Sequence, residues 1–514
     1  MQGFVIYFEL RIVFKMTFIR KIKKDGKIYL AEVENKKING KVIQKHIRYI
    51  GKEVDGETKL AVSISDVQID EVKFYGPLLV LHHIANKIGL PELLGECSNE
   101  ILSLIYAHCL DYKSVSKMKE WFKRTDLSCL LNIKEVTEKS LLSALDKLDA
   151  LNFDEIQLKL FNCISENIKV KKSCVVYDVT NTYFHGSQCS IAKLGHDKEG
   201  AKGRPLIQIG LAITKDQGFP LFHKVFEGNI SDVKTLQEFM IRIKKYKISS
   251  GILVYDRGIS SADNIEYAKK VGFDTLCGLP MNNKLKILLR SLKKNSIINL
   301  SNRVKTSNTV FYAISHEYKI GTISGNVIFC FNEKKHRGLR ESRYDEIMAA
   351  EKLLKKNKKI KEGMNKYFNK NNTINKKYLN EVEEFDGYFC LFSTKNISKD
   401  DAVNLYFDKD EVEKSFQSIK GVTHLRPIRH WLYNRVEAHV KICYFSYAIL
   451  SVMRHYLKKI NITPATALTH LSSFYKIYMR DKNKGLKFEK FVILKKIQKD
   501  ILKSIDPKLL KGSV

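Results

Sequence analysis

The apolar and polar residues near the start of the chain alternate, which is the pattern of β-strands with one buried face. Three such segments follow one another: FIRKIKK, KIYLAEVE and KVIQKHIRYIG. They are separated by Asp25-Gly26 and Asn39-Gly40, dipeptides that favour tight hairpin turns. We therefore expect a small β-element over residues 16–60. Its basic strands suit a DNA backbone or a solvated sheet face equally well.

Between residues 69 and 168 the apolar residues recur at intervals of three and four, which is the spacing of amphipathic helices. The clearest stretches are GPLLVLHHIANKIGLPELLG and EILSLIYAHCLDYKSVSKMKEWFKR. We expect a helical module over residues 69–168. Its size suits site-specific DNA binding, although no helix-turn-helix signature stands out.

From residue 171 onward, short β-branched runs replace the helical pattern and predict a sheet. The strands SCVVYDVTNTYF, LIQIGLAIT and PLFHKVFEG are joined in hairpin order, and Ser231-Asp232 can cap the helix TLQEFMIRIKKY that follows. A strand, GILVYDRG, then a helix and a last strand, FDTLCGL, complete the run. This order predicts a mixed α/β sheet, with Asp178 on its first strand and Asp256 at the end of its fourth.

Residues 281–385 interrupt the predicted sheet. They contain strand-like segments in VFYAISHEYKIGTISGNVIFCF and a lysine- and asparagine-rich part, EKLLKKNKKIKEGMNKYFNKNNT, that is helical or mobile. We interpret them as an inserted subdomain. The sheet, which occupies residues 171–280, is expected to resume over residues 386–425. Residues 426–514 are expected to form a basic helical region.

The segment DAVNLYFDKDEVEKSFQSIK is predicted to form one helix. Tyr406, Lys409, Glu413 and Lys420 lie at offsets of three, four and seven, so their side chains share one face of that helix. An acid between cations on one face suits a phosphate backbone with a bound metal ion. Taken alone, the pattern also fits a salt-bridged surface helix.

Three acids that are distant in the sequence, Asp178, Asp256 and Glu413, can converge in this arrangement. Each also has a structural interpretation, as a turn cap, a loop ion pair or a partner of Lys409. Three carboxylates at one point repel one another unless divalent cations are bound between them. Oxygen ligands without Cys or His favour Mg²⁺ or Mn²⁺, and two such ions about 4 Å apart activate a water or a 3′-hydroxyl toward a phosphodiester. No Ser or Cys lies in a recognisable nucleophile motif.

The charge of the chain indicates the kind of partner. Its 514 residues carry 89 Lys and Arg against 56 Asp and Glu, a net charge of +33 that is spread along the whole chain. The excess favours a polyanion, with nucleic acid ahead of membrane. A lysine-rich coding bias is the alternative, but it does not readily explain the deficit of acids. The length predicts several domains.

The ten cysteines are scattered, and none forms a Cys-x-x-Cys pair. We interpret them as reduced thiols of a cytosolic protein, with neither a zinc site nor a disulfide framework. No apolar run approaches the roughly 20 residues of a membrane span. His439 and Cys443 are four residues apart without a second pair of ligands, so we expect them in a core. Met16 is a more natural start than Met1, and N-terminal sequencing of the native protein tests this.

Several motifs together resemble one family. YDVTNTYF, FEGNISDVKTL, VYDRGISS and RPIRHW, with the spacing Tyr406-x2-Lys409-x3-Glu413-x6-Lys420, are similar to those of bacterial insertion-sequence transposases of the DDE type. The family's signature around the last acid is Tyr-Arg-Glu-Lys, so Lys409 replaces an arginine. This should weaken a bidentate grip on phosphate but keep the charge. The resemblance covers roughly residues 171–450.

The resemblance implies an α/β fold with a ribonuclease-H-like catalytic core, three metal-binding acids and four residues that bind DNA near the cleaved phosphate. The acids are Asp178, Asp256 and Glu413, with two Mg²⁺ ions, or Mn²⁺, as the cofactor. The DNA-binding residues are Tyr406, Lys409, Lys420 and Arg426. The implied reaction nicks the inverted-repeat ends of an element and joins the freed 3′-hydroxyl to target DNA. The implied assembly is a homodimer on DNA in the bacterial cytosol, without a membrane.

Two other functions fit the same residues. A metal-dependent nuclease with this core would use the same acids but would not join strands. An inactive DNA-binding protein derived from a transposase would keep the positive charge without the chemistry. Joined products from the protein, Mg²⁺ and a labelled inverted repeat would favour the transposase.

Overall fold

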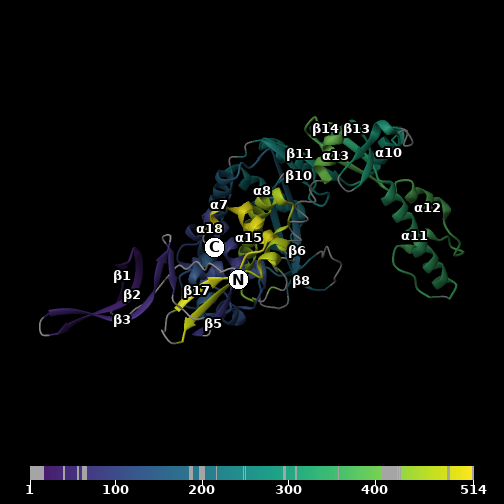
Figure 1. Cartoon of the computed structure of the whole chain (residues 1–514). Helices are drawn as coiled ribbons and strands as arrows, with labels where there is room; N and C mark the ends of the chain where they lie inside the picture. Colours follow the sequence, from purple (N-terminus) through teal and green to yellow (C-terminus); the bar gives the residue numbers. More distant parts are fainter. Residues whose placement is uncertain are drawn as a thin grey trace. The chain divides into compact units, whose positions relative to one another are not determined.

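The computed structural model of the chain divides into two compact units (Figure 1). One unit combines the residues up to Phe153 with those from Asn434 onward, and the other begins at Asp154 and contains the described residues through Phe407. The structure describes residues 17–38, 41–54, 57–60, 66–184, 189–195, 203–215, 217–246, 248, 250–292, 297–306, 309–356, 358–407, 425, 428, 430–482 and 487–511.

The second unit is built on a large mixed sheet. Its described strands follow the order β12-β13-β14-β15-β11-β10-β6-β8-β7, and β9 also pairs with β8. The strands are β6 (Cys174–Tyr183), β7 (Lys193–Leu194), β8 (Pro205–Thr214), β9 (Pro220–Glu227), β10 (Gly251–Tyr255), β11 (Phe273–Leu279), β12 (Arg303–Lys305), β13 (Val310–Ile320), β14 (Ile323–Phe331) and β15 (Tyr388–Ser393).

The central strands have the predicted order. β6, β8 and β9 are antiparallel neighbours, while β10 runs parallel to β6 and β11 runs parallel to β10. Parallel neighbours need a crossover connection, which is provided by α8 (Asp232–Ile243) before β10 and α9 (Ala262–Lys270) before β11. Ser231 lies at the N-cap position of α8 as predicted, but its side chain makes no capping hydrogen bond. Ser261 does cap α9, because its hydroxyl accepts the Asn264 backbone N–H at 3.1 Å.

Side chains along each strand alternate between the two faces of the sheet. Val175 and Tyr177 of β6 and Tyr255 of β10 belong to one buried core with Phe239 of α8 and Ile265 of α9. The residues that alternate with them, including Asp178 and Asp256, therefore lie on the opposite face.

The face that carries the two aspartates is covered by α13 (Lys399–Phe407). Phe407 of this helix stacks on Phe311 of β13, with ring centroids 4.3 Å apart and an angle of 16° between the ring planes. Phe407 also contacts Phe389 of β15, with centroids 5.6 Å apart. These rings fix the end of α13 against the sheet. The structure describes α13 through Phe407, which confirms the first part of the predicted signature helix, and residues 408–420 lie outside the described residues.

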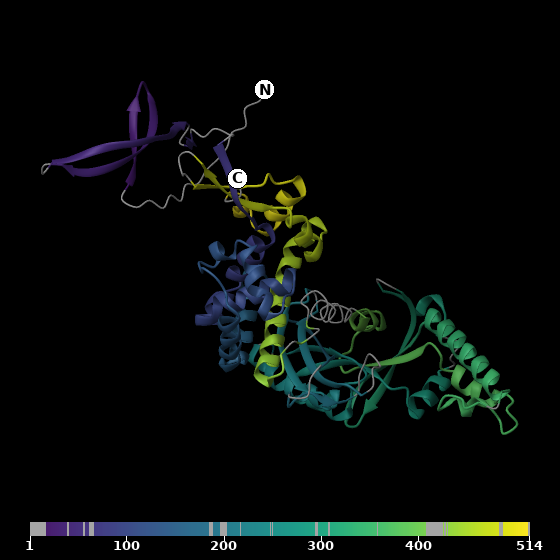
Figure 2. The same cartoon turned by 90° about the horizontal axis from the view of Figure 1, so that it is seen from below.

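The strands predicted inside residues 281–385 extend the main sheet. β13 and β14 form a hairpin, and β14 pairs with β15 from Asn326↔Ser393 to Phe331↔Tyr388. Between β14 and β15 the chain forms α11 (Glu333–Leu354) and α12 (Lys376–Glu383), which lie beside one another in Figure 2. Ile347 and Ala350 of α11 form a small core with Met364 and Phe368 from the connecting segment, and Leu379 of α12 packs against it. The predicted domain boundaries remain predictions.

A paired arginine joins α11 to the start of β15. Arg343 donates two hydrogen bonds to the Asp386 carboxylate, at 2.5 and 2.6 Å, and both side chains are largely buried. We expect Arg343→Met to destabilise α11 by about 3 kcal/mol, because it leaves a buried carboxylate without its partner. Hydrogen exchange of the α11 amides measures this. Arg337→Met, which removes an exposed pair with Glu333 on the same helix, should cost less than about 0.5 kcal/mol. Equal effects would contradict the prediction.

The first unit contains the predicted helical module up to Phe153 together with the last helices of the chain. Its helices include α1 (Gly76–Lys87), α2 (Leu90–Leu94), α3 (Ser98–Leu110), α4 (Met118–Lys123), α5 (Leu127–Leu130), α6 (Glu138–Ala150), α15 (Tyr433–Leu457), α16 (Pro464–Leu471), α17 (Lys496–Ile505) and α18 (Lys508–Lys511). α7 (Phe153–Asn167) begins at the boundary between the units. α15 is buried around most of its circumference, as expected for the central helix of a packed bundle.

Two segments that the sequence predicted as helical are strands. β5 (Val67–Phe74) pairs with β16 (Tyr475–Asp481), which also pairs with β17 (Lys487–Phe491). The helical module therefore begins at α1 and not at residue 69, and the region 426–514 is not wholly helical. The reason is that β5 and β16 lie near opposite ends of the chain, so their pairing leaves no local signal in either segment.

The predicted β-element at the start of the chain is confirmed as strands. β1 (Thr17–Lys24), β2 (Lys27–Ile38), β3 (Lys41–Val54) and β4 (Glu57–Leu60) form an antiparallel sheet in chain order. The turn between β1 and β2 uses Asp25 and Gly26 with φ values of 50° and 72°, as its sequence predicts. Asn39 and Gly40 lie outside the described residues.

Two further predictions concern the first unit. His439 and Cys443 are buried as predicted, and they contact the Leu425 carbonyl (3.2 Å) and the His108 ring (3.6 Å) respectively. None of the described helices combines the length and the apolar character needed to cross a membrane.

Candidate active site

Asp178 and Asp256 lie on neighbouring parallel strands and on the same face of the sheet. β10 pairs with β6 through Ile252↔Cys174, Leu253↔Val175 and Val254↔Val176. Asp256 directly follows β10, and continuing this register by two residues sets it opposite Asp178 of β6. Both aspartates are partly exposed, whereas Val176 and Val254 before them are buried. The prediction that these acids come from adjacent strands is therefore confirmed.

Backbone groups orient both carboxylates. Oδ1 of Asp178 accepts the Val179 N–H at 2.8 Å, and Oδ1 of Asp256 accepts the Arg257 N–H at 2.7 Å. The Asp256 carbonyl accepts the N–H of Ile259 at 3.1 Å, which closes a tight turn directly after β10.

Asn264 of α9 holds that turn in place. Its buried side-chain amide donates to the carbonyl of Ile259 at 2.8 Å and to that of Val233 at 2.9 Å. The loop that follows Asp256 is thereby tied to the start of α8. A carboxylate at the end of a strand is held more rigidly when the following loop is hydrogen-bonded in this way.

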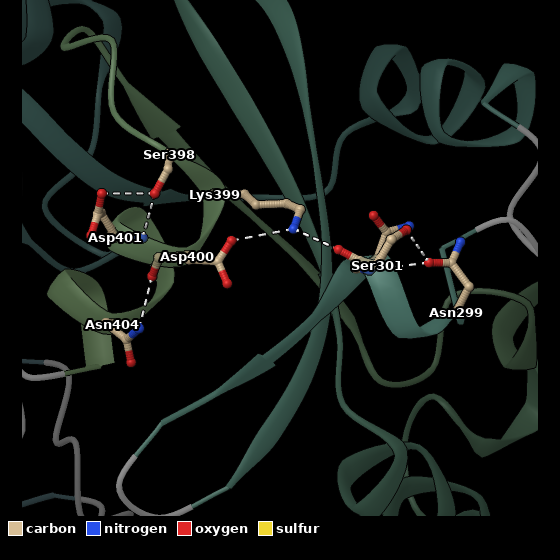
Figure 3. A network of polar contacts seen from close by, with 8 residues as sticks. Asn299, Ser301, Ser398, Lys399, Asp400, Asp401 and Asn404 are labelled. Carbon is tan, nitrogen blue, oxygen red and sulfur yellow. Dashed lines mark hydrogen bonds and ion pairs between the residues drawn. The ribbon is translucent and has the colours of Figure 1, made fainter.

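The first turn of α13 is anchored at several points (Figure 3). The Ser398 hydroxyl donates to the Asp401 carboxylate at 2.7 Å and accepts the Asp401 N–H at 3.0 Å, which is a reciprocal helix cap. Lys399 donates to Asp400 at 3.2 Å and to the Ser301 carbonyl at 3.0 Å. The two acids in the first turn also complement the positive end of the helix dipole. These contacts determine where the last turn of α13 reaches the sheet.

That last turn brings Tyr406 to Asp256. The buried Tyr406 hydroxyl donates to Asp256 Oδ1 at 2.9 Å. Burial, together with the negative charge of Asp256, raises the pKa of the Tyr406 phenol well above its ordinary value. The phenol therefore stays protonated, and remains a hydrogen-bond donor, throughout the neutral range.

Gly278 of β11 provides the space for this hydrogen bond. β11 pairs with β10 through Tyr255↔Cys277, so Gly278 is the next residue in the row that contains Asp256. A Cβ atom at Gly278 would lie 2.7 Å from the Tyr406 hydroxyl and 3.2 Å from the Cβ of Arg257. Sequence reasoning did not select Gly278, although a glycine inside a strand is a known sign of close approach by another group.

The structure describes only part of the predicted site. It brings Tyr406 into contact with Asp256 and places Asp178 beside them. Tyr406 was predicted to bind DNA; that role stays a prediction, to which the geometry adds a contact with the carboxylate. The other four predicted residues, Lys409, Glu413, Lys420 and Arg426, lie outside the described residues.

The chemistry of the two aspartates fits a hard divalent cation. Carboxylate oxygens without sulfur or imidazole ligands are the donor set that Mg²⁺ and Mn²⁺ prefer. Within the described ranges, no group of three His, Cys, Asp or Glu side chains is arranged to hold a metal ion. A third carboxylate would have to come from another part of the chain, and Glu413 is the residue that the sequence predicts.

Comparison with known proteins gives three results. Residues 169–449 match a protein family described as the transposase DDE domain. Among solved structures, the chain is similar to a piggyBac transposase in a synaptic complex with hairpin DNA, with 12% sequence identity over 77% of this chain and 79% of that chain and a TM-score of 0.35. No curated protein matches the sequence.

Proposed function

The chain belongs to the transposase DDE domain family, and from this premise we propose that it cuts the ends of a bacterial insertion sequence and joins the freed 3′-hydroxyl to target DNA. The observation that carries this proposal is the register of β6 and β10, which puts Asp178 and Asp256 on the same face of adjacent strands, where both side chains are partly exposed. The net charge of +33 supports DNA as the partner and the cytosol or nucleoid as the location.

We propose that the sheet is a ribonuclease-H-like core. Three antiparallel strands, β9, β8 and β6, followed by the parallel strands β10 and β11, support this assignment. Because α8 and α9 lie on one face and α13 on the other, the aspartates are on the α13 side, with Asp178 within β6 and Asp256 directly after β10.

Asp178, Asp256 and Glu413 are proposed to bind two Mg²⁺ ions, with Mn²⁺ as a substitute. When bound in such a site, these ions activate the attacking hydroxyl and stabilise the leaving oxygen of the phosphodiester. The chain's own contribution is orientation: Tyr406 and the Arg257 N–H hold Asp256 Oδ1, so the direction of this carboxylate is set before DNA arrives.

Two cations of the signature helix and Arg426, which follows it in the sequence, are proposed to hold the DNA. Lys409, Lys420 and Arg426 would contact phosphates near the cleaved bond, with Lys409 as a single-point contact where the family has an arginine. A homodimer is proposed because two element ends must be held together before strands are joined.

Strand joining separates this proposal from a nuclease with the same core. The protein is incubated with Mg²⁺, a labelled terminal inverted repeat and a supercoiled plasmid. We expect nicked ends and a labelled plasmid product. Nicked ends without joined product would favour the nuclease, and binding without either product would favour an inactive DNA-binding protein.

Glu413→Gln is expected to abolish cleavage while leaving end binding nearly unchanged. The substitution removes one negative charge and a metal ligand but keeps the size of the side chain. Gel-shift titration measures binding, and the labelled-end assay measures cleavage. Cleavage at the parental rate would reject Glu413 as the third acid.

A further inference from the structure

The segment between α11 and α12 carries an unusual concentration of positive charge. Residues 352–377, here called the lysine tip, contain ten lysines and a single acidic residue, Glu362. The lysines are Lys352, Lys355, Lys356, Lys358, Lys359, Lys361, Lys366, Lys370, Lys376 and Lys377. The chain as a whole has 89 basic and 56 acidic residues. A coding bias toward lysine acts on the whole chain, so it does not explain this local ratio.

The lysine tip is a folded structure. Met364 and Phe368 are buried against Ile347 and Ala350 of α11. The short helix η7 (Met364–Tyr367) and a turn in which the Asn369 N–H donates to the Thr373 carbonyl at 2.8 Å connect α11 to α12. Most apolar side chains of the segment are thus buried in this small core or packed against it, whereas all ten lysines are exposed. A folded scaffold presents these charges without the ordering cost that a disordered tail would have.

Few of these lysines form ion pairs. Within the described part of the chain, only two of the ten lysines form ion pairs: Lys355 with Glu351 (3.0 Å) and Lys361 with Glu346 (3.5 Å). Like charges on one small surface repel each other, and a bound polyanion removes that repulsion. A membrane is a poorer partner. Ile347 and Ala350 of α11 are buried in the small core, and the apolar residues of this helix that are exposed, such as Leu339 and Met348, are interspersed with charged residues.

We propose that the lysine tip binds the phosphate backbone of duplex DNA, separately from the phosphates held at the acids. The choice of DNA as the polyanion rests on the proposed function. Duplex DNA presents a phosphate charge about every 1.7 Å along its axis, so lysines spread over two helices and a loop can each find one. Residues 352–377 contain no arginine, whose guanidinium can bind phosphate through two hydrogen bonds. Lysine contacts to phosphates carry no sequence information, so this surface suits DNA outside the recognised element end.

The test removes four of the charges without removing apolar contacts. In the tip variant, Lys355, Lys356, Lys358 and Lys359 are all changed to Gln. In the control variant, four other lysines are changed to Gln. They are also exposed but lie on the α8 and α9 side of the sheet: Lys244, Lys245, Lys269 and Lys270. Affinity for a duplex of arbitrary sequence is measured in EDTA over about 50 to 200 mM salt. If two of the four tip lysines contact phosphates, the salt slope falls by about two and affinity near 0.1 M salt falls roughly 10- to 100-fold.

The control variant should change both quantities much less. Unchanged binding by the tip variant, or an equal loss in both variants, overturns the proposal. Loss of binding to phosphatidylserine vesicles without loss of DNA binding also overturns it. Circular dichroism shows that each variant is folded. Because the binding assay runs in EDTA, it does not depend on catalysis. Absence of cleavage by the parent protein would count against the proposed function. Unchanged DNA binding by the tip variant would count against DNA binding by the lysine tip.

Discussion

Changing Asp256 to Asn is expected to lower cleavage of a labelled element end by about a thousandfold or more, and Asp178→Asn should do the same. The two carboxylates share one face of adjacent strands, so each substitution removes a charge from the same proposed ion site. Asparagine keeps the shape of the side chain and the backbone contacts of Val179 and Arg257. Stability and end binding should therefore change little. Single-turnover cleavage with Mg²⁺ is the measurement.

A thiol variant separates a metal ligand from a structural acid. Asp256→Cys should be inactive with Mg²⁺ but regain part of its cleavage activity with Mn²⁺, because the softer ion accepts a thiolate more readily. Asp274, which is partly buried on β11 and pairs with Lys269 at 3.1 Å, provides the control. Asp274→Asn should retain most activity. Parental cleavage by either Asn variant of the candidate acids would refute the site.

The second large effect is expected from Gly278→Ala, which should reduce the cleavage rate by about 10- to 100-fold. The new methyl group would lie 2.7 Å from the Tyr406 hydroxyl, so the hydroxyl must leave Asp256. Tyr406→Phe deletes the same hydrogen bond and should give a similar loss. Because both changes act on one contact, their effects should not add.

The double variant tests whether Gly278 acts through Tyr406. In the Tyr406→Phe background no hydroxyl remains to be displaced, so Gly278→Ala should have almost no further effect on the cleavage rate. Losses that multiply would show that Gly278 acts through the strand backbone and not through Tyr406. The dependence of rate on Mg²⁺ concentration is a second readout, since a misdirected carboxylate should raise the metal concentration needed for half-maximal rate.

Much of the second unit could be predicted because its signals are local. Apart from the two-residue β7, which was not predicted, each strand from β6 to β11 is a short apolar run bounded by turn residues, and the order of hairpins and crossovers follows from the chain connections. That order was sufficient to predict Asp178 and Asp256 on neighbouring strands. The contact between Tyr406 and Asp256 was not predicted, because the helical pattern says which residues share a face and not what that face touches.

The errors came from interactions between distant segments. β5 and β16 pair across nearly the whole chain, so neither segment shows its partner in its own sequence. The strands β13 and β14 were predicted correctly, yet only the pairing of β14 with β15 reveals that they continue the main sheet. Gly278 was not predicted because its role depends on its proximity to the Tyr406 hydroxyl of α13, which is distant in the sequence.

The pairing of Phe331 with Tyr388 means that the chain leaves the sheet and returns to it at one place. The Asn332 N–H even donates to the Gly387 carbonyl, at 2.9 Å, across the gap. The residues between them, which have their own small core and the Arg343–Asp386 pair, therefore form an insertion between two neighbouring paired strands. The length, sequence or charge of this insertion can therefore change while the strands that carry the aspartates keep their register.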